Sequence, residues 1–142
     1  MQNKFSLLLG LALFSSPVLA EPKPTFTQAF QQLEKEFDRA SSASNQSEYQ
    51  LRLKQNPSQA EKLDSLKLEC ELIKIKFKSL DLIDQNFEDF KIQINEPSLS
   101  RDKLDVKYTR TQNELDQLNQ DLKETTFKCK IWGLFRVLIF AF

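Results

Sequence analysis

The stretch of sequence from Asn56 to Glu96 reads NPSQAEKLDSLKLECELIKIKFKSLDLIDQNFEDFKIQINE. Asn56, Pro57 and Gln59 suit the N-cap, the first helical position and the capping box of a helix start. Apolar residues then recur at steps of three or four, which is typical of one buried helical stripe: Leu63, Leu66, Cys70, Ile73, Phe77, Leu80, Ile83, Phe87, Phe90 and Ile94. We therefore expect one helix of about 40 residues before Pro97.

A second stripe follows Pro97, and either Ser98 or Ser100 can cap its helix. The stripe consists of Leu104, Tyr108, Thr111, Leu115, Leu118, Leu122, Thr125, Cys129 and Trp132. No proline or glycine interrupts this helix before Gly133, so we expect it to continue that far. The two long helices predict an antiparallel hairpin resembling a coiled coil.

A shorter amphipathic helix is expected near the N-terminus, where Thr25 can cap the apolar stripe of Phe26, Phe30, Leu33, Phe37 and Ala40. The small polar residues 41–47 predict a flexible connection. Residues 48–55 fit a strand or a helix, and we favour a helix or an irregular arm. The predicted fold is all-α, a three-helix bundle made of the hairpin and this shorter helix.

The numbering of the two long stripes predicts how they face each other. Position numbers of facing residues in an antiparallel pair add to a constant, and Cys70 with Cys129 and Phe77 with Leu122 both give 199. Five further pairs give 198: Leu80 with Leu118, Ile83 with Leu115, Phe87 with Thr111, Phe90 with Tyr108 and Ile94 with Leu104. This register brings the only two cysteines together and predicts a Cys70–Cys129 disulfide. Two buried free thiols are the alternative.

The first twenty residues resemble a targeting segment more than part of a fold. Lys4 precedes an apolar run, and Val18 and Ala20 suit a signal-peptidase site, so we expect cleavage after Ala20. An uncleaved anchor is the alternative. The chain then divides into a signal peptide (1–20), a helix with its linker (21–47), the hairpin (48–130) and an apolar tail (131–142), and the expected location is periplasmic or secreted.

The tail, residues 131–142, is the most apolar stretch after the signal peptide, but it is too short to span a bilayer as a helix. One interpretation packs it under the first helix, with Leu66 beside Trp132 and Leu63 beside Phe135. Another makes it a membrane-surface or partner-docking segment, and a third makes it a last strand or an atypical terminus. The candidate contact residues are Trp132, Phe135, Leu138, Phe140 and Phe142.

The composition of the 142 residues indicates one domain and offers little for catalysis. The chain has no histidine and only two glycines, which leaves no histidine base and argues against a glycine-rich phosphate cradle. Twenty basic and twenty acidic residues provide no field for nucleic acid. We expect no catalytic, metal or cofactor site.

The predicted function is therefore that of an exported, non-enzymatic helical protein with a structural or protein-binding role. Its partner would be an unknown protein or a second copy of the chain. The alternative is an envelope factor attached to a membrane surface through residues 131–142.

Overall fold

The computed structural model describes residues 25–131, and this part of the chain is helical without strands. Its four helices are α1 (Phe26–Leu53), α2 (Gln59–Gln85), α3 (Phe87–Gln93) and α4 (Arg101–Asp121). The all-α prediction is confirmed, with four helices in place of the expected three. The expected signal peptide and the five candidate contact residues of the tail lie outside the described residues.

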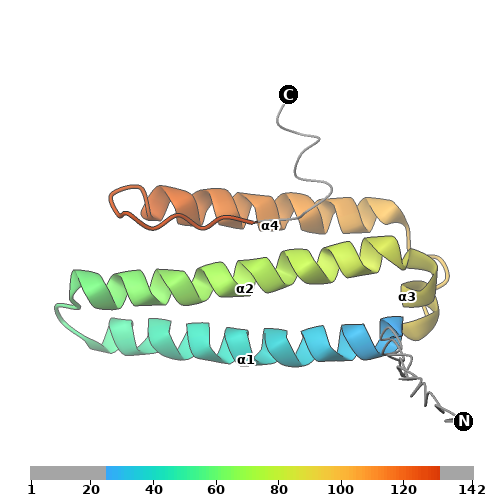
Figure 1. Cartoon of the computed structure of the whole chain (residues 1–142), viewed down its shortest axis with the longest axis horizontal. Coiled ribbons are helices and arrows are strands. Elements are labelled where there is room, and N and C mark those ends of the chain that lie inside the picture. The colour runs from blue at the N-terminus through green and yellow to red at the C-terminus, as the bar shows by residue number, and fades with distance from the viewer. Residues whose placement is uncertain (1–24, 132–142) are drawn as a thin grey trace, which may run out of the picture.

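The three long helices lie side by side with α2 in the middle, as Figure 1 shows. Helix α2 packs on α1 along one side and on α4 along the other. Short α3 lies at the end where α2 leads into α4. Helix α2 therefore takes part in two interfaces, one with α1 and one with α4. They differ in how deeply their side chains are buried.

Among residues 25–131, all of the buried side chains lie in or near the interface between α2 and α4. One cluster combines α2 and α4 with the segment after α4: Cys70, Ile73, Phe77, Leu115, Leu118, Leu122 and Cys129. A smaller cluster of Leu80, Phe87 and Leu104 continues toward α3. Helix α1 contains no buried residue. The hydrophobic core is therefore a property of α2, α3 and α4.

Helix α1 runs through the region that we expected to be a flexible connection. Residues 41–47 are helical, and α1 ends only at Leu53. Along this region the half-buried positions continue the spacing of the aromatic stripe, with the small residues Ala40, Ser41, Ala43, Ser44 and Ser47 facing inward. Packing against α2 supports the helix here although serine is a modest helix former. The true connection between α1 and α2 is residues 54–58.

Helix α2 begins two residues later than expected, because Ser58 and not Asn56 is its N-cap. The Ser58 hydroxyl accepts a hydrogen bond from the Glu61 backbone N–H at 3.2 Å, and the Glu61 carboxylate accepts one from the Ser58 N–H at 2.9 Å. This reciprocal pair is a capping box. Lys54 at the end of α1 also pairs with Glu61. The hydrogen bonds from Lys54 and Ser58 lower the pKa of the Glu61 carboxyl to about 2.

Replacement of Ser58 by alanine is expected to lower the free energy of unfolding by about 1 kcal/mol, because an N-cap hydrogen bond is lost. The measurement is urea unfolding followed by circular dichroism. Ser100 is the matched control, since it is the N-cap of α4 but its side chain makes no capping hydrogen bond. Ser100→Ala should change stability by less than about 0.5 kcal/mol. Equal losses in the two variants would contradict the assignment.

The long helix expected up to Pro97 is interrupted at Asn86. The Asn86 side-chain amide donates to the Leu82 carbonyl at 2.9 Å, and its backbone angles, φ −125° and ψ 40°, leave the helical region. A short asparagine side chain that bonds to the backbone competes with the helix in this way. The chain re-enters a helix as α3 and leaves it before Asn95, whose φ of 55° is left-handed. Two helices therefore replace the single one that we predicted.

Helix α4 ends at Asp121, well before Gly133, and the chain then reverses direction. The Thr125 hydroxyl donates to the Leu122 carbonyl at 2.8 Å and accepts from the Phe127 N–H at 3.2 Å, which holds the turn. We call residues 122–131 the return segment. Figure 1 shows it running back beside α4. Cys129 therefore lies in a segment without regular secondary structure and not on a helix.

The helical register also differs from the predicted one. Position numbers of contacting residues add to 190 for Lys76 with Glu114, 189 for Asp81 with Tyr108, and 185 for both Asp84 with Arg101 and Phe77 with Tyr108. The predicted values of 198 and 199 are wrong for these helices. The reversal after Leu122 explains the difference, because it places Cys129 beside Asn119. That position is about 15 Å, or nearly three helical turns, earlier along α4 than Cys129 would occupy in an unbroken helix.

Candidate functional site

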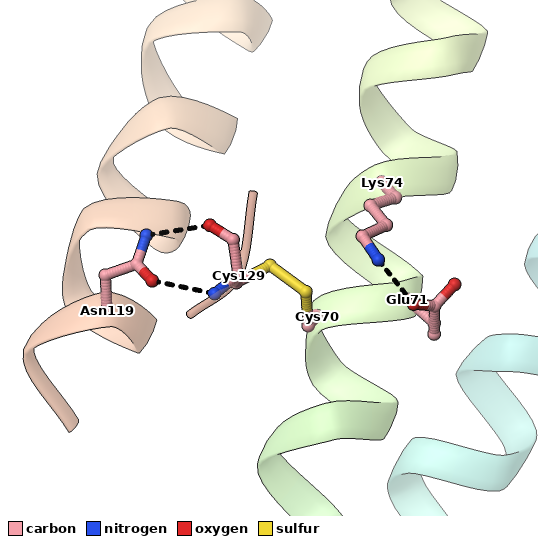
Figure 2. The surroundings of a disulfide bond; sticks show 5 residues. All are labelled: Cys70, Glu71, Lys74, Asn119 and Cys129. Carbon is pink, nitrogen blue, oxygen red and sulfur yellow. Dashed lines mark hydrogen bonds and ion pairs between the residues drawn. A yellow bond between two sulfur atoms is a disulfide. The ribbon is translucent and has the colours of Figure 1, made fainter. Parts of the chain in front are cut away.

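The predicted disulfide is confirmed, and it is the only covalent link between α2 and the return segment. Cys70 and Cys129 are bonded with a Cα–Cα distance of 5.6 Å, and they are 0% and 3% exposed. Figure 2 shows the bond between α2 and the return segment, with Glu71 and Lys74 paired on another side of α2. A disulfide this well buried is inaccessible to large thiol reagents and acts as a structural cross-link.

Asn119 fixes the return segment against α4 with two hydrogen bonds to one residue. Its side-chain amide donates to the Cys129 carbonyl at 3.1 Å and its oxygen accepts from the Cys129 N–H at 3.0 Å. Both polar groups of the Cys129 backbone are thereby satisfied in a buried place, where an unpaired group would be costly. Sequence reasoning missed Asn119, because nothing in its neighbourhood distinguishes it from a solvent-facing asparagine.

Polar contacts align α2 with α4 at the edges of the core. Lys76 and Glu114 form an ion pair at 2.6 Å, and the Tyr108 hydroxyl donates to Asp81 at 2.6 Å. Arg101 pairs with Asp84 and stacks over the Phe87 ring at 4.7 Å from its centroid. These contacts fix the register, and they are satisfied within the fold.

Glu69 in α2, next to the disulfide, lies within electrostatic range of acidic side chains of α1 and α4. Partial desolvation raises the pKa of the Glu69 carboxyl, and the negative charges of Asp121, Glu48 and Glu114 act in the same direction. Among residues 25–131 no group of three or more side chains is arranged to hold a metal ion. The acidic residues repel one another and cost stability at neutral pH.

Glu69→Gln is expected to raise the stability at pH 7 by no more than about 0.5 kcal/mol, since solvent screens this surface position. The raised pKa means that the folded state binds the proton more tightly than the unfolded state, whose pKa is near 4.5. The destabilisation is therefore present above the folded-state pKa and disappears as the pH falls below 4.5. Urea unfolding at pH 7 and pH 3 measures this. The same gain at both pH values would contradict the charge origin.

A shallow groove of about 270 Å³ lies between α1 and α2. Its lining is mainly aliphatic, with charged side chains at the margins: Glu36, Arg39, Ala40, Ala43, Leu68, Glu71 and Ile75. The two alanines leave this space because their side chains are short. It contains no arrangement of nucleophile and base, and its shape suits an apolar surface contact more than a reaction.

Several large apolar side chains are exposed on the helices. Tyr49 and Leu53 at the end of α1 are 60% and 62% exposed, Ile92 in α3 is 78% exposed, and Val106 in α4 is 67% exposed. Single exposed apolar residues are common in monomers. Here they accompany the half-exposed stripe of α1, so apolar surface is available on each of these three helices.

The fold and the site define an all-α helical bundle whose principal core is fixed by one disulfide. No helix among residues 25–131 is long and apolar enough to cross a membrane. Comparison of the chain with family models, with curated proteins and with solved structures finds no match.

Proposed function

We propose that this chain is an exported, non-enzymatic helical protein of the periplasm or the extracellular space, and that it binds another protein along its helices. The buried disulfide supports export, because disulfides persist in oxidising compartments. The N-terminal sequence, with its basic residue, apolar run and Ala20, supports the same route.

The observation that carries the binding role is the partial burial of α1. This helix is 28 residues long and has a complete apolar stripe, yet none of its residues is buried. A monomer seldom leaves such a stripe half-covered along a whole helix, whereas interaction surfaces combine apolar and polar residues in this way.

Site-specific photo-cross-linking in the native envelope tests this role. A photoreactive phenylalanine analogue replaces Tyr49 in one variant and exposed Gln32, on the polar side of α1, in the control. We expect a discrete cross-linked product from position 49 that excess unlabelled protein competes away, and none from position 32. Absence of any competed product from position 49 would contradict the proposal.

Mass spectrometry of the exported protein, with and without reduction, tests the compartment. We expect an N-terminus at Glu21 and a mass difference equal to two hydrogens between the reduced and non-reduced forms. Retention of residues 1–20, or free thiols at Cys70 and Cys129 in the native sample, would contradict the export route.

The alternative function is attachment to a membrane surface through residues 131–142. The observation that favours it is the composition of this stretch, IWGLFRVLIFAF, which is apolar apart from Arg136. Flotation with liposomes compares the full chain with a chain that stops at Ile131. Loss of flotation on truncation would favour attachment, and recovery of both chains in the soluble fraction would exclude it.

A further inference from the structure

The return segment is held against the helices by one covalent contact and by several noncovalent ones. The disulfide joins Cys129 to Cys70 on α2, and the Asn119 side chain of α4 forms two hydrogen bonds with the Cys129 backbone. Phe127 and Ile131 also pack against the cluster that surrounds the disulfide. Only the disulfide needs an oxidant, so the other contacts are available to the reduced chain.

The turn that leads into the return segment also forms without the disulfide. The Thr125 hydroxyl donates to the Leu122 carbonyl and accepts from the Phe127 N–H, at 2.8 Å and 3.2 Å. These bonds join residues three and two positions apart, and closing so short a loop costs little chain entropy. The chain therefore reverses its direction after α4 through local contacts.

Asn119 is placed to position Cys129 in particular. Its amide donates to the Cys129 carbonyl at 3.1 Å and its oxygen accepts from the Cys129 N–H at 3.0 Å, as Figure 2 shows. Two bonds to the backbone of one residue fix its place along the segment and the direction of its peptide groups. The Cα atoms of Cys129 and Cys70 are then 5.6 Å apart, within the range that a disulfide needs.

We infer that the return segment docks on the helices before the disulfide forms, and that Asn119 is the positioning residue that brings the Cys129 thiol to Cys70. Docking holds the two thiols at a high effective concentration, which speeds the closing of the bond. This order of events holds whatever other protein the chain binds.

The bond closes through two thiol–disulfide exchanges with a small disulfide such as glutathione disulfide. In the first exchange, with the segment briefly undocked, one cysteine thiolate attacks the small disulfide, forms a mixed disulfide and releases one glutathione thiolate. In the second, when the segment docks again, the other cysteine thiolate attacks the protein sulfur of the mixed disulfide and releases the second glutathione. The two cysteines are oxidised, and one glutathione disulfide is reduced to two thiols.

Hydrogen exchange of the reduced wild-type chain tests whether the segment docks without the bond. The Cys129 N–H donates to the Asn119 side chain, so its exchange rate reports this contact directly. We expect this amide to exchange at least about tenfold more slowly than in the same chain unfolded by urea. Exchange at the unfolded rate, with or without protection of α2 and α4, would overturn the inference.

The rate of bond closure tests the role of Asn119. The reduced full chain is mixed with glutathione disulfide, the reaction is stopped with acid, and the reduced chain, the glutathione adduct and the closed form are separated by mass. We expect the adduct of Asn119→Ala to close at least about tenfold more slowly than that of the wild type, because two hydrogen bonds that hold Cys129 near Cys70 are lost.

Asn113→Ala is the matched control. Asn113 lies on the same helix, is exposed, and makes no side-chain hydrogen bond among residues 25–131. Its adduct should close at the wild-type rate. Equal slowing in the two variants would overturn the role of Asn119.

A hydrogen-bonded contact that forms only after the disulfide would give a different kinetic result. Asn119→Ala would then close at the wild-type rate, while reduced glutathione would reopen its disulfide faster than that of the wild type. That combination would assign Asn119 to the closed form alone and overturn the proposed order.

Discussion

Replacement of both Cys70 and Cys129 by alanine is expected to lower the free energy of unfolding by about 4 kcal/mol. The bond joins residues 59 apart, and the chain-entropy model assigns a stabilisation of this size to a closed loop of this length. The stability of a whole domain is only about 5–15 kcal/mol, so the loss is a large fraction of it. Urea unfolding of the oxidised wild type and the double variant measures the difference.

The wild type with a reductant is the matched control for that measurement. Unfolded in urea with reductant and refolded in its presence, the wild-type chain should have the stability of the double variant, and reductant should leave the double variant unchanged. The return segment should also lose part of its protection from hydrogen exchange, because the hydrogen bonds of Asn119 and the packing of Phe127 and Ile131 then hold it without a covalent bond. A loss below about 1 kcal/mol would show that the native packing alone positions the return segment.

The second large effect is expected from Phe77→Ala, with a loss of about 3–5 kcal/mol in the free energy of unfolding. Phe77 is 1% exposed, belongs to the cluster that surrounds the disulfide, and has its ring 6.4 Å from that of Tyr108. Removal of the ring leaves a cavity between α2 and α4 that the cross-linked backbone cannot readily close. Equilibrium unfolding by urea, followed by circular dichroism, provides the value.

Ile92→Ala is the control for that substitution, because Ile92 is 78% exposed in α3. It should change the stability by less than about 0.5 kcal/mol. A loss in Phe77→Ala no greater than in Ile92→Ala would mean that the interface between α2 and α4 does not carry the stability assigned to it.

Helix positions could be predicted from the sequence because apolar spacing and caps are local properties. The stripes that include Phe37, Phe77 and Leu115 predict three long helices, and all three are present. The serine-rich residues 41–47 were misread, since serine favours loops in isolation while α2 offers a surface that small residues can approach closely. Packing against α2 therefore determined that residues 41–47 are helical.

The disulfide pair was predicted correctly together with an incorrect helical register. The predicted register assumed that Cys129 continues the stripe of α4, but the chain turns at Thr125 and brings Cys129 back beside Asn119. With only two cysteines, the pairing did not depend on the register. The opposing pair proposed at Phe77 and Leu122 did depend on it, and Tyr108 is the residue whose ring contacts that of Phe77.

All five candidate contact residues of the tail, from Trp132 to Phe142, lie outside the described residues. What the structure adds is a different surface, α1 with its groove beside Ala43. No local pattern indicates that a helix with a full apolar stripe will remain half-exposed. That outcome depends on what packs against the helix.

The sequence by itself determined that this chain is helical, that α1 begins after Thr25, and that Cys70 joins Cys129, because periodicity, capping and cysteine number are readable from the sequence. Only the tertiary structure decided where α2 and α4 end, how they face each other, and that α1 lies outside the buried core. Those features depend on tertiary contacts, such as Asn119 with Cys129, and on the packing of α1 and α4 against α2. The spacing of apolar residues within one helix does not determine such contacts.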